Sequence, residues 1–128
     1  MDVWGASADE DGVPWLVPLR FLGDGTDSWM ATRPGNPTGR NLRVGGRTRL
    51  AFGDTRDVVL IDGNVETFEG PDAPAAATEA FTAKYGWGPR ADRARCTWFR
   101  VRPVTVRAWH EVRELPQRYV MREGVRLV

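Results

Sequence analysis

Apolar residues alternate with polar ones over most of this chain, with the two-residue period that is typical of β-strands. Turn signals rich in Gly, Asp and Asn separate these alternating segments, as in Asp9-Glu10-Asp11-Gly12. From this pattern we predict strands over residues 4–8, 15–22, 28–32, 48–52, 58–67 and 98–109, and a last hairpin that pairs residues 119–121 with 125–128.

Three residues qualify these predicted strands. Residues 15–22 are apolar on both faces, which predicts a strand covered on both sides, while Pro18 favours an edge position or a bulge. Gly63 predicts a bulge within residues 58–67. Pro103 interrupts the long strand over residues 98–109, so we expect the pairing register to shift there.

Helical signals are confined to two segments. Asp72 is a candidate N-cap for a helix that runs to Tyr85, with Pro74 early in it and Gly86 as its stop signal. A shorter helix is predicted over residues 38–44. The pattern therefore predicts one small antiparallel β domain over residues 1–128, with six to seven strands and two short helices. Closing the strands into a barrel would remove exposed sheet edges.

Composition narrows the class of protein. Hydrophobic residues make up 41% and charged residues 27%, which excludes a disordered chain, and no apolar run is long enough to span a bilayer. The N-terminus has no signal-peptide pattern, so we expect a cytoplasmic protein. The net charge is +1, divided as −5 over residues 1–72 and +6 over residues 73–128. This balance does not predict nucleic-acid binding.

The chain is poor in catalytic side chains. Cys96 is the only Cys and His110 the only His, which excludes a disulfide framework and multi-His or multi-Cys metal sites. Neither a GxSxG elbow nor a Walker phosphate loop is present. Chemistry with so few acids, bases and nucleophiles favours a borrowed cofactor.

Arginine is distributed unevenly. Five Arg and no acid fall between Ser28 and Gly53, at positions 33, 40, 43, 47 and 49. Asn36 is a good N-cap and Pro37 suits a first helical position, so free amides there, with Thr38, Arg33 and Arg40, predict a phosphate site. A solvated loop followed by a small surface helix explains the same residues.

Four segments, in order, carry a resemblance to the pyridoxamine 5'-phosphate oxidase-like split β-barrel family, whose members bind FMN or a deazaflavin. They are Asp11-Gly-Val-Pro14 with Val17-Pro-Leu19, Ala31-Thr32 with Thr38-Gly-Arg-Asn-Leu42, residues 57–66, and Trp98-Phe-Arg-Val-Arg-Pro103 with Ala108-Trp109. Together they span nearly the whole chain. The resemblance implies a split β-barrel and a homodimer with flavin sites at the subunit interface.

The resemblance also implies which residues bind the cofactor. Thr32, Thr38, Arg40 and Asn41 would surround the flavin phosphate, with Arg33 beside them, and the strand at Val17, Pro18 and Leu19 would lie along the isoalloxazine ring. We expect FMN, with 8-hydroxy-5-deazaflavin as the alternative, and hydride transfer to or from a small organic substrate.

Two other functions stay open. One is a non-catalytic protein that binds or sequesters flavin or haem, with His110 as a possible axial ligand; the other is a β-barrel interaction module without a ligand. Among the six Trp, we expect Trp29 and Trp98 in the core and Trp87 as a packing anchor in a loop. For Trp109, a role at a dimer interface or a flavin edge is the less favoured alternative.

Overall fold

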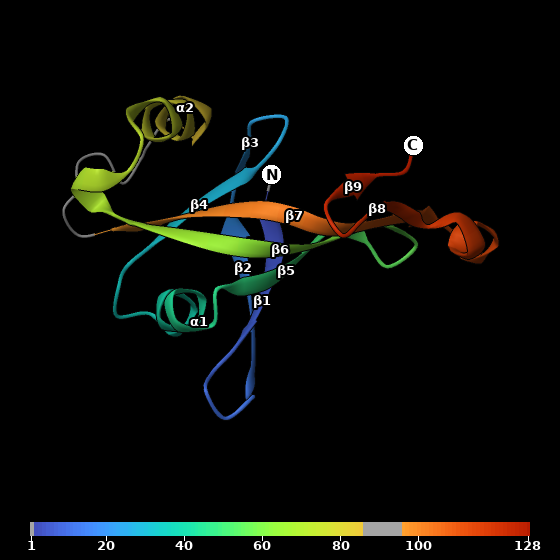
Figure 1. The fold of residues 1–128 in the computed structure, drawn as a ribbon, viewed down its shortest axis with the longest axis horizontal. Helices are drawn as coiled ribbons and strands as arrows, with labels where there is room; N and C mark the ends of the chain where they lie inside the picture. Colours follow the sequence, from blue (N-terminus) through green and yellow to red (C-terminus); the bar gives the residue numbers. More distant parts are fainter. Residues whose placement is uncertain (1, 86–95) are drawn as a thin grey trace.

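One antiparallel sheet organises the protein (Figure 1). The computed structural model describes residues 2–85 and 96–128, and nine strands lie within them. The strands are β1 (Asp2–Ala8), β2 (Pro14–Arg20), β3 (Leu22–Gly23), β4 (Ser28–Thr32), β5 (Arg47–Asp54), β6 (Asp57–Glu69), β7 (Thr97–His110), β8 (Tyr119–Arg122) and β9 (Val125–Arg126).

The sheet is not closed, which fits a split barrel. Its order is β2-β1-β5-β6-β7-β4-β3. In addition, β8 pairs with β7, and β9 pairs with β8. The same edge of β7 therefore pairs with β4 along its first half and with β8 near Val106 and Arg107. The predicted mainly β, antiparallel split-barrel architecture is confirmed, with two of the nine strands only two residues long.

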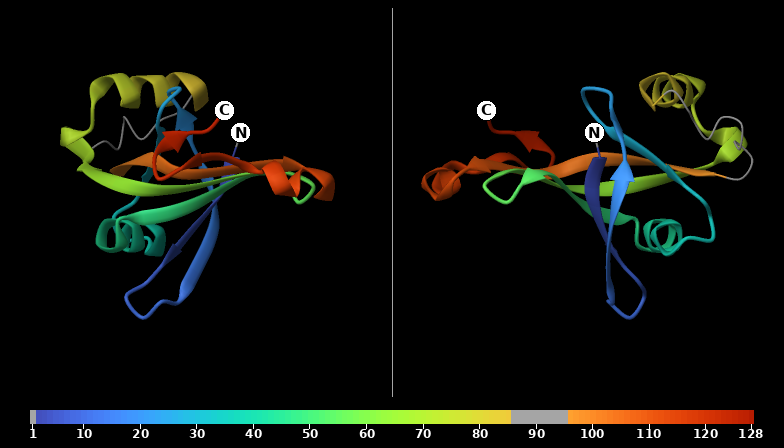
Figure 2. Two further views of the ribbon diagram at one scale, coloured as in Figure 1. Left: turned by 45° about the vertical axis from the view of Figure 1, so that its right-hand side comes forward. Right: turned by 180° about the vertical axis from the view of Figure 1, so that it is seen from behind.

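Two helices cover the sheet on opposite sides (Figure 2). Helix α1 (Pro37–Gly45) confirms the short helix predicted over residues 38–44. Helix α2 (Ala75–Tyr85) confirms the second one, but it begins two residues later than a cap at Asp72 predicts. Short 3-10 turns span Gly70–Asp72 and Val112–Gln117. Within the described ranges, no helix is long and apolar enough to cross a membrane.

The predicted cap at Asp72 is wrong, and Pro74 supplies the reason. A proline disfavours helical backbone in the residue before it, and Ala73 is extended, with φ −66° and ψ 137°. The carbonyl of Pro74 instead accepts the amides of Ala77 and Thr78, each at 3.1 Å. Asp72 ends the preceding 3-10 turn, and the predicted stop at Gly86 lies outside the described residues.

Both predicted irregularities in the long strands are confirmed at one place. Thr105 pairs with Asp62 but Pro103 pairs with Gly63, so the register shifts between Asp62 and Gly63. A Cβ at Gly63 would lie 2.5 Å from Val101 Cγ1 and 2.9 Å from the Arg102 carbonyl oxygen. Only a glycine lets the two backbones approach this closely.

Strand β2 occupies a sheet edge, as Pro18 predicts, but the prediction that both its faces are covered is wrong for the single chain. Val17 and Leu19 are half-buried, whereas Leu16 is 61% exposed. The reason is topological, because no layer formed by residues 2–85 and 96–128 packs on the outer face of β1 and β2. Trp4, opposite Pro18 in that face, is 50% exposed.

Strand alternation divides the core into two clusters. Met30 and Phe99, paired across β4 and β7, point into one cluster with Leu42 of α1 and Leu50 of β5. The next pair, Ala31 and Trp98, points the other way, and Trp98 packs edge-on against Phe81 of α2. Trp29 and Trp98 are buried, as predicted. Opposite side chains of successive strand residues explain why each helix covers its own cluster.

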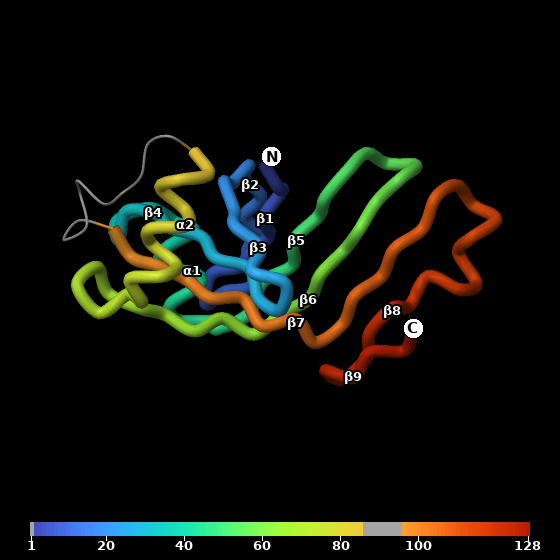
Figure 3. Tube along the Cα trace, turned by 90° about the horizontal axis from the view of Figure 1, so that it is seen from above, coloured from blue at the N-terminus to red at the C-terminus, as the bar shows by residue number. Residues whose placement is uncertain are grey.

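The far end of the sheet carries no helix from α1 or α2. There the β5–β6 hairpin and the segment from the end of β7 to β9 extend away from the two helices (Figure 3). The turn between β8 and β9 is joined to β7 by a hydrogen bond from the Gly124 amide to the Val104 carbonyl, at 2.8 Å. This C-terminal hairpin is therefore part of the sheet.

Candidate functional site

The start of α1, where a phosphate site was predicted, is occupied by contacts within the chain. Asn36 is the N-cap residue, but its side chain makes no cap hydrogen bond and instead donates to Thr32 Oγ1 at 3.0 Å. The Trp15 indole donates to Thr38 Oγ1 at 3.0 Å, and Thr38 is buried. Two of the predicted phosphate-binding hydroxyls, those of Thr32 and Thr38, thus already accept hydrogen bonds from the chain.

Gly39 lies in the first turn of α1, and the side of it that carries no Cβ faces the chain itself. A Cβ at Gly39 would lie 3.0 Å from the Arg33 carbonyl oxygen and 3.3 Å from Thr32 Cγ2. The loop that leads into α1 therefore folds back against the first turn of the helix. The close approach that needs a glycine here is that of the chain's own backbone.

Apart from Arg33, which lies in the loop before α1, the remaining predicted residues lie around the β1–β2 hairpin. Asn41 Nδ2 donates to Ser7 Oγ at 3.2 Å, while the Arg40 and Arg33 side chains are exposed. Arg40 and Asn41 line a small hollow of about 330 Å³ that also contains the acids Asp9 and Glu10. Thr38 and Asn41 thus contact the β1–β2 hairpin through Trp15 and Ser7, and the same hairpin contains Val17, Pro18 and Leu19. Cofactor binding by these eight residues stays a prediction.

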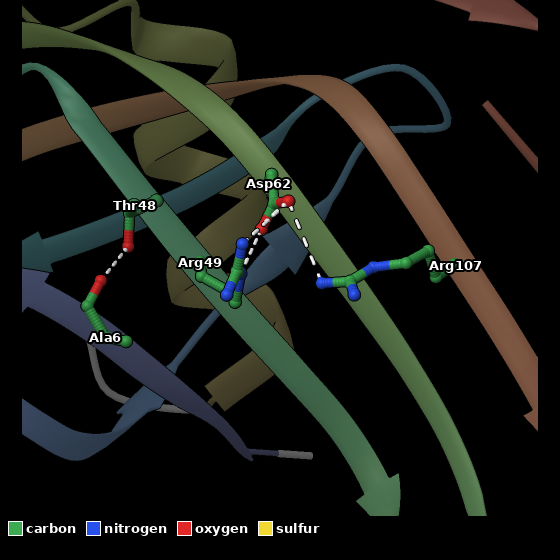
Figure 4. Close-up of polar contacts among 5 residues, drawn as sticks. All are labelled: Ala6, Thr48, Arg49, Asp62 and Arg107. Carbon is green, nitrogen blue, oxygen red and sulfur yellow. Dashed lines mark hydrogen bonds and ion pairs between the residues drawn. The ribbon is translucent and has the colours of Figure 1, made fainter. Parts of the chain in front are cut away.

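A larger groove opens where β1 separates from β5. Strand β1 pairs with β2 along its whole length but with β5 only from Trp4 to Ala6. The pairing of β1 with β5 ends at Ala6, whose carbonyl accepts a hydrogen bond from the Thr48 hydroxyl at 2.7 Å (Figure 4). The groove has a volume of about 440 Å³, and residues 6–8, 47–49, 62–64, 104 and 105 line it.

Two arginines of β5 reach this groove. Arg47 and Arg49 are two positions apart, so strand alternation places them on one face, with Thr48 buried between them. Among the described residues, no carboxylate pairs with Arg47. Its exposed guanidinium is therefore available to an anion in the groove.

Asp62 of β6 partly neutralises the other arginine. Arg49 makes two hydrogen bonds to the Asp62 carboxylate, one of them from Nη2 at 3.1 Å, and Arg107 of β7 lies 3.8 Å from the same carboxylate (Figure 4). The bond to Asp62 raises the pKa of the Arg49 guanidinium, which therefore stays charged. With three arginines and one acid, this part of the sheet is positive.

Sequence reasoning did not select Arg47 and Arg49, although both fall in the acid-free stretch. Their signal is the Arg-x-Arg spacing on a predicted strand, which places two cations on one face. That signal does not reveal which face is open, because the groove depends on where β1 leaves β5. Asp62 also comes from another strand, 13 residues further along the chain.

The groove fits a phosphate-bearing cofactor in size and chemistry. Its volume lies within the range of roughly 300–1,000 Å³ that is typical of small-molecule and cofactor sites. Planar guanidinium groups form paired hydrogen bonds with phosphate oxygens. Arg47 and Arg49 are the residues placed to hold such a phosphate.

Other candidate residues lie elsewhere. His110 ends β7 with its side chain 54% exposed, and its Nδ1 is 3.8 Å from the Asp57 carboxylate. No group of three or more metal-ligating side chains occurs within residues 2–85 and 96–128. Cys96 is buried, Trp109 is half-buried opposite Val58, and Trp87 lies outside the described residues.

Fold and groove together define a split β-barrel with a basic groove. A family model described as pyridoxamine 5'-phosphate oxidase matches residues 3–110, so the chain belongs to that family. The match includes the groove and ends before the C-terminal hairpin. A comparison with curated proteins gave no match.

Solved structures share this fold. An F420 reductase has a TM-score of 0.68 at 20% identity, with 83% of this chain and 88% of that chain covered. A putative pyridoxamine 5'-phosphate oxidase from Listeria innocua has a TM-score of 0.68 at 16% identity, covering 84% and 86%. A conserved hypothetical protein from Mycobacterium tuberculosis has a TM-score of 0.69 at 21% identity, covering 85% and 76%. At these identities, the likeness concerns the fold alone.

Proposed function

We propose that this protein is a flavin- or deazaflavin-dependent oxidoreductase that transfers hydride to or from a small organic substrate. The observation that carries the proposal is the groove of about 440 Å³ with Arg47 and Arg49 on one wall, in a chain of the pyridoxamine 5'-phosphate oxidase family. FMN is the proposed cofactor, and 8-hydroxy-5-deazaflavin is the alternative. The fold shared with an F420 reductase supports that alternative.

In this proposal the chain binds and orients the cofactor. Arg47 and Arg49 hold the phosphate, Asp62 keeps Arg49 in place, and Asn64 offers an amide side chain on the same wall. The competing location is the start of α1, where Thr32, Arg33, Thr38, Arg40 and Asn41 would hold the phosphate beside Val17, Pro18 and Leu19. When bound, the cofactor itself supplies hydride transfer at its central ring.

We further propose a homodimer in which a second copy covers the outer face of β1 and β2. Trp4 and Leu16 are 50% and 61% exposed there, and large apolar side chains on an edge of the sheet favour a partner. A second copy in this position would also enclose the groove beside β1 and exclude water from it. Light scattering on wild type and on Leu16→Glu tests this, and a monomeric wild type contradicts it.

The cofactor proposal is tested by titrating the purified protein with FMN and with 8-hydroxy-5-deazaflavin while following visible absorbance. We expect one of them to bind saturably, and Arg47→Gln to weaken that binding about 10- to 100-fold, since charge-assisted hydrogen bonds contribute about 1.5–3 kcal/mol. Arg56→Gln, an exposed arginine of the β5–β6 turn outside the groove, is the matched control.

Two outcomes contradict the proposal, one from this titration and one from a turnover assay with the reduced cofactor. If neither cofactor binds, the protein is not a flavin-dependent enzyme. If one binds tightly but the reduced cofactor is not oxidised by any of a panel of organic acceptors, the protein is a non-catalytic cofactor-binding protein.

A further inference from the structure

A second cleft adjoins the groove on the side of the C-terminal hairpin. Its volume is about 380 Å³, and it shares Arg49, Asp62 and Thr105 with the groove. The rest of its lining comes from Arg107 of β7 and from the β8–β9 hairpin, which contributes Tyr119, Arg122 and Glu123. The hairpin lies beyond residues 3–110, to which the family match is confined.

Backbone hydrogen bonds to β7 hold the hairpin in place, one before β8 and one at the turn between β8 and β9. The Ala108 amide donates to the Arg118 carbonyl at 2.7 Å, and the Gly124 amide donates to the Val104 carbonyl at 2.8 Å. Met121 pairs with Val106 in the sheet. Arg107 and Arg122 therefore extend from a common sheet rather than from a loose tail, which favours a preformed site.

Positive charge exceeds negative charge in the lining of the cleft. Three arginines, Arg49, Arg107 and Arg122, stand against the carboxylates of Asp62 and Glu123. Arg49 already occupies Asp62 with two hydrogen bonds, whereas Arg107 lies 3.8 Å from it, beyond hydrogen-bonding distance. Within the described residues, no acceptor forms a hydrogen bond with the Arg107 guanidinium, so its donors are available.

Tyr119 responds to this positive environment. The adjacent Arg122 side chain has the largest effect on the pKa of the Tyr119 phenol and lowers it; desolvation comes second and raises it, and the charges of Arg118, Arg122 and Arg107 lower it further. The Arg122 guanidinium carbon lies 3.7 Å from the centre of the Tyr119 ring, which orients the side chain beside the cleft. A phenol and two guanidiniums are donors suited to an oxyanion.

Glu123 is the opposing charge in this lining, and it occupies an unusual backbone position. Its φ is 51° and that of Gly124 is 77°, the left-handed pair of a tight hairpin turn in which Asn-Gly is the common sequence. Glu123 takes the first position of this turn, where Asn adopts the left-handed backbone more readily than Glu does. The glutamate also adds a negative charge to the lining of the cleft. Its charge therefore opposes binding of an anion there.

We propose that this cleft binds the carboxylate or phosphate group of the organic substrate, with Arg107, Arg122 and Tyr119 as the donors. The assignment to a substrate rests on the proposed oxidoreductase function, whereas anion binding in the cleft does not. The substrate class is then a small organic anion, whose charged end lies in the cleft while the rest extends toward the groove that the cleft adjoins.

The test is an NMR titration of the full ¹⁵N-labelled chain with inorganic phosphate, following the amides of residues 119–124. We expect saturable shifts that weaken about tenfold in Arg122→Gln, consistent with loss of a charge-assisted hydrogen bond, and that tighten in Glu123→Gln. Arg113→Gln is the control, because it removes an exposed arginine of the same C-terminal segment that does not line the cleft. Equal weakening in the control, or no localised shift, overturns the anion site.

A second titration, in the presence of saturating FMN or deazaflavin, separates the inference from the proposed function. Persistent phosphate binding at residues 119–124 supports a substrate site beside the cofactor. If the cofactor displaces phosphate from these residues, the cofactor's own anionic group occupies the cleft, which overturns the assignment to a substrate. If no cofactor binds while phosphate does, the proposed function and the substrate assignment fail together, and the anion site stands.

Discussion

Two regions of this protein draw arginines from the same acid-free stretch, and they use them differently. At the start of α1, the Arg33 carbonyl lies close to Gly39 and the Trp15 indole donates to Thr38, while Arg40 and Asn41 line a hollow of about 330 Å³. In the groove beside β5, Arg47 and Arg49 line a larger opening of about 440 Å³. Arginines from one stretch of sequence therefore border two openings, and at the first of them the chain itself already contacts the start of the helix.

The largest expected effect tests the structural part of this comparison. Leu42 anchors α1 in the core and is 1% exposed, so Leu42→Ala removes packing and leaves a cavity. We expect a loss of about 2–5 kcal/mol in the free energy of unfolding, measured with urea. Val44→Ala, on the exposed part of the same helix, is the control and should change little. Equal stabilities of the two variants would mean that α1 is not packed as described.

The second prediction sets the two arginine regions directly against each other. Because Arg47 lines the groove and Arg40 lies at α1, Arg47→Gln should weaken cofactor binding about 10- to 100-fold, while Arg40→Gln should leave it unchanged. Absorbance titration of both variants under one set of conditions gives the answer. The reverse ranking would return the phosphate to the start of α1 and to the residues predicted there.

Thr38 sharpens the comparison with a smaller change. In Thr38→Val the Trp15 indole, whose residue is 40% exposed, loses its acceptor, so we expect a loss of about 0.5–1.5 kcal/mol in the free energy of unfolding. Cofactor affinity should be unaffected where the protein is folded. A loss of affinity without a loss of stability would identify Thr38 as a ligand of the phosphate.

The smallest expected effect provides a pH control remote from both arginine regions. The amides of Asp27 and Thr26 and the Trp29 indole hydrogen-bond to Asp24 and lower its pKa. The pKa of Asp24 is lower in the folded protein than in the unfolded chain. The contribution of the Asp24 carboxylate to stability is therefore complete above the unfolded pKa and is lost as the pH falls through the folded pKa. Asp24→Asn should therefore flatten this acid-range dependence in thermal unfolding curves, whereas an unchanged dependence would contradict the role of Asp24.

Local signals predicted much of the fold. Gly63 and Pro103 were predicted separately as irregularities, and they prove to be the two sides of one register shift. The helix that begins at Ala75 was placed too early, because Asp72 is a good cap by type while Pro74 forces Ala73 into an extended conformation. Apolar residues on both faces of β2 predicted a strand that is buried on both sides. In the part of the chain that the structure describes, nothing packs on one of these faces, and Leu16 is exposed there.

The residues of the candidate site were harder to predict from the sequence than the fold was. The resemblance indicated a flavin-binding barrel, and the family is confirmed, whereas the residues implied for the phosphate remain untested. Arg107 and Asp62 meet in space although 45 residues separate them, so no local spacing places them together. Such contacts depend on strand order and register, which are non-local properties.

Strand alternation, the two short helices and the excess of arginine over lysine follow from the order of residues in the chain. Which arginines converge depends on the tertiary structure. Strand β1 leaves β5 after Ala6, and the space that it vacates is lined by Arg47 and Arg49. The physical reason is that side-chain direction follows from local backbone geometry, whereas an opening between strands depends on how distant segments pair.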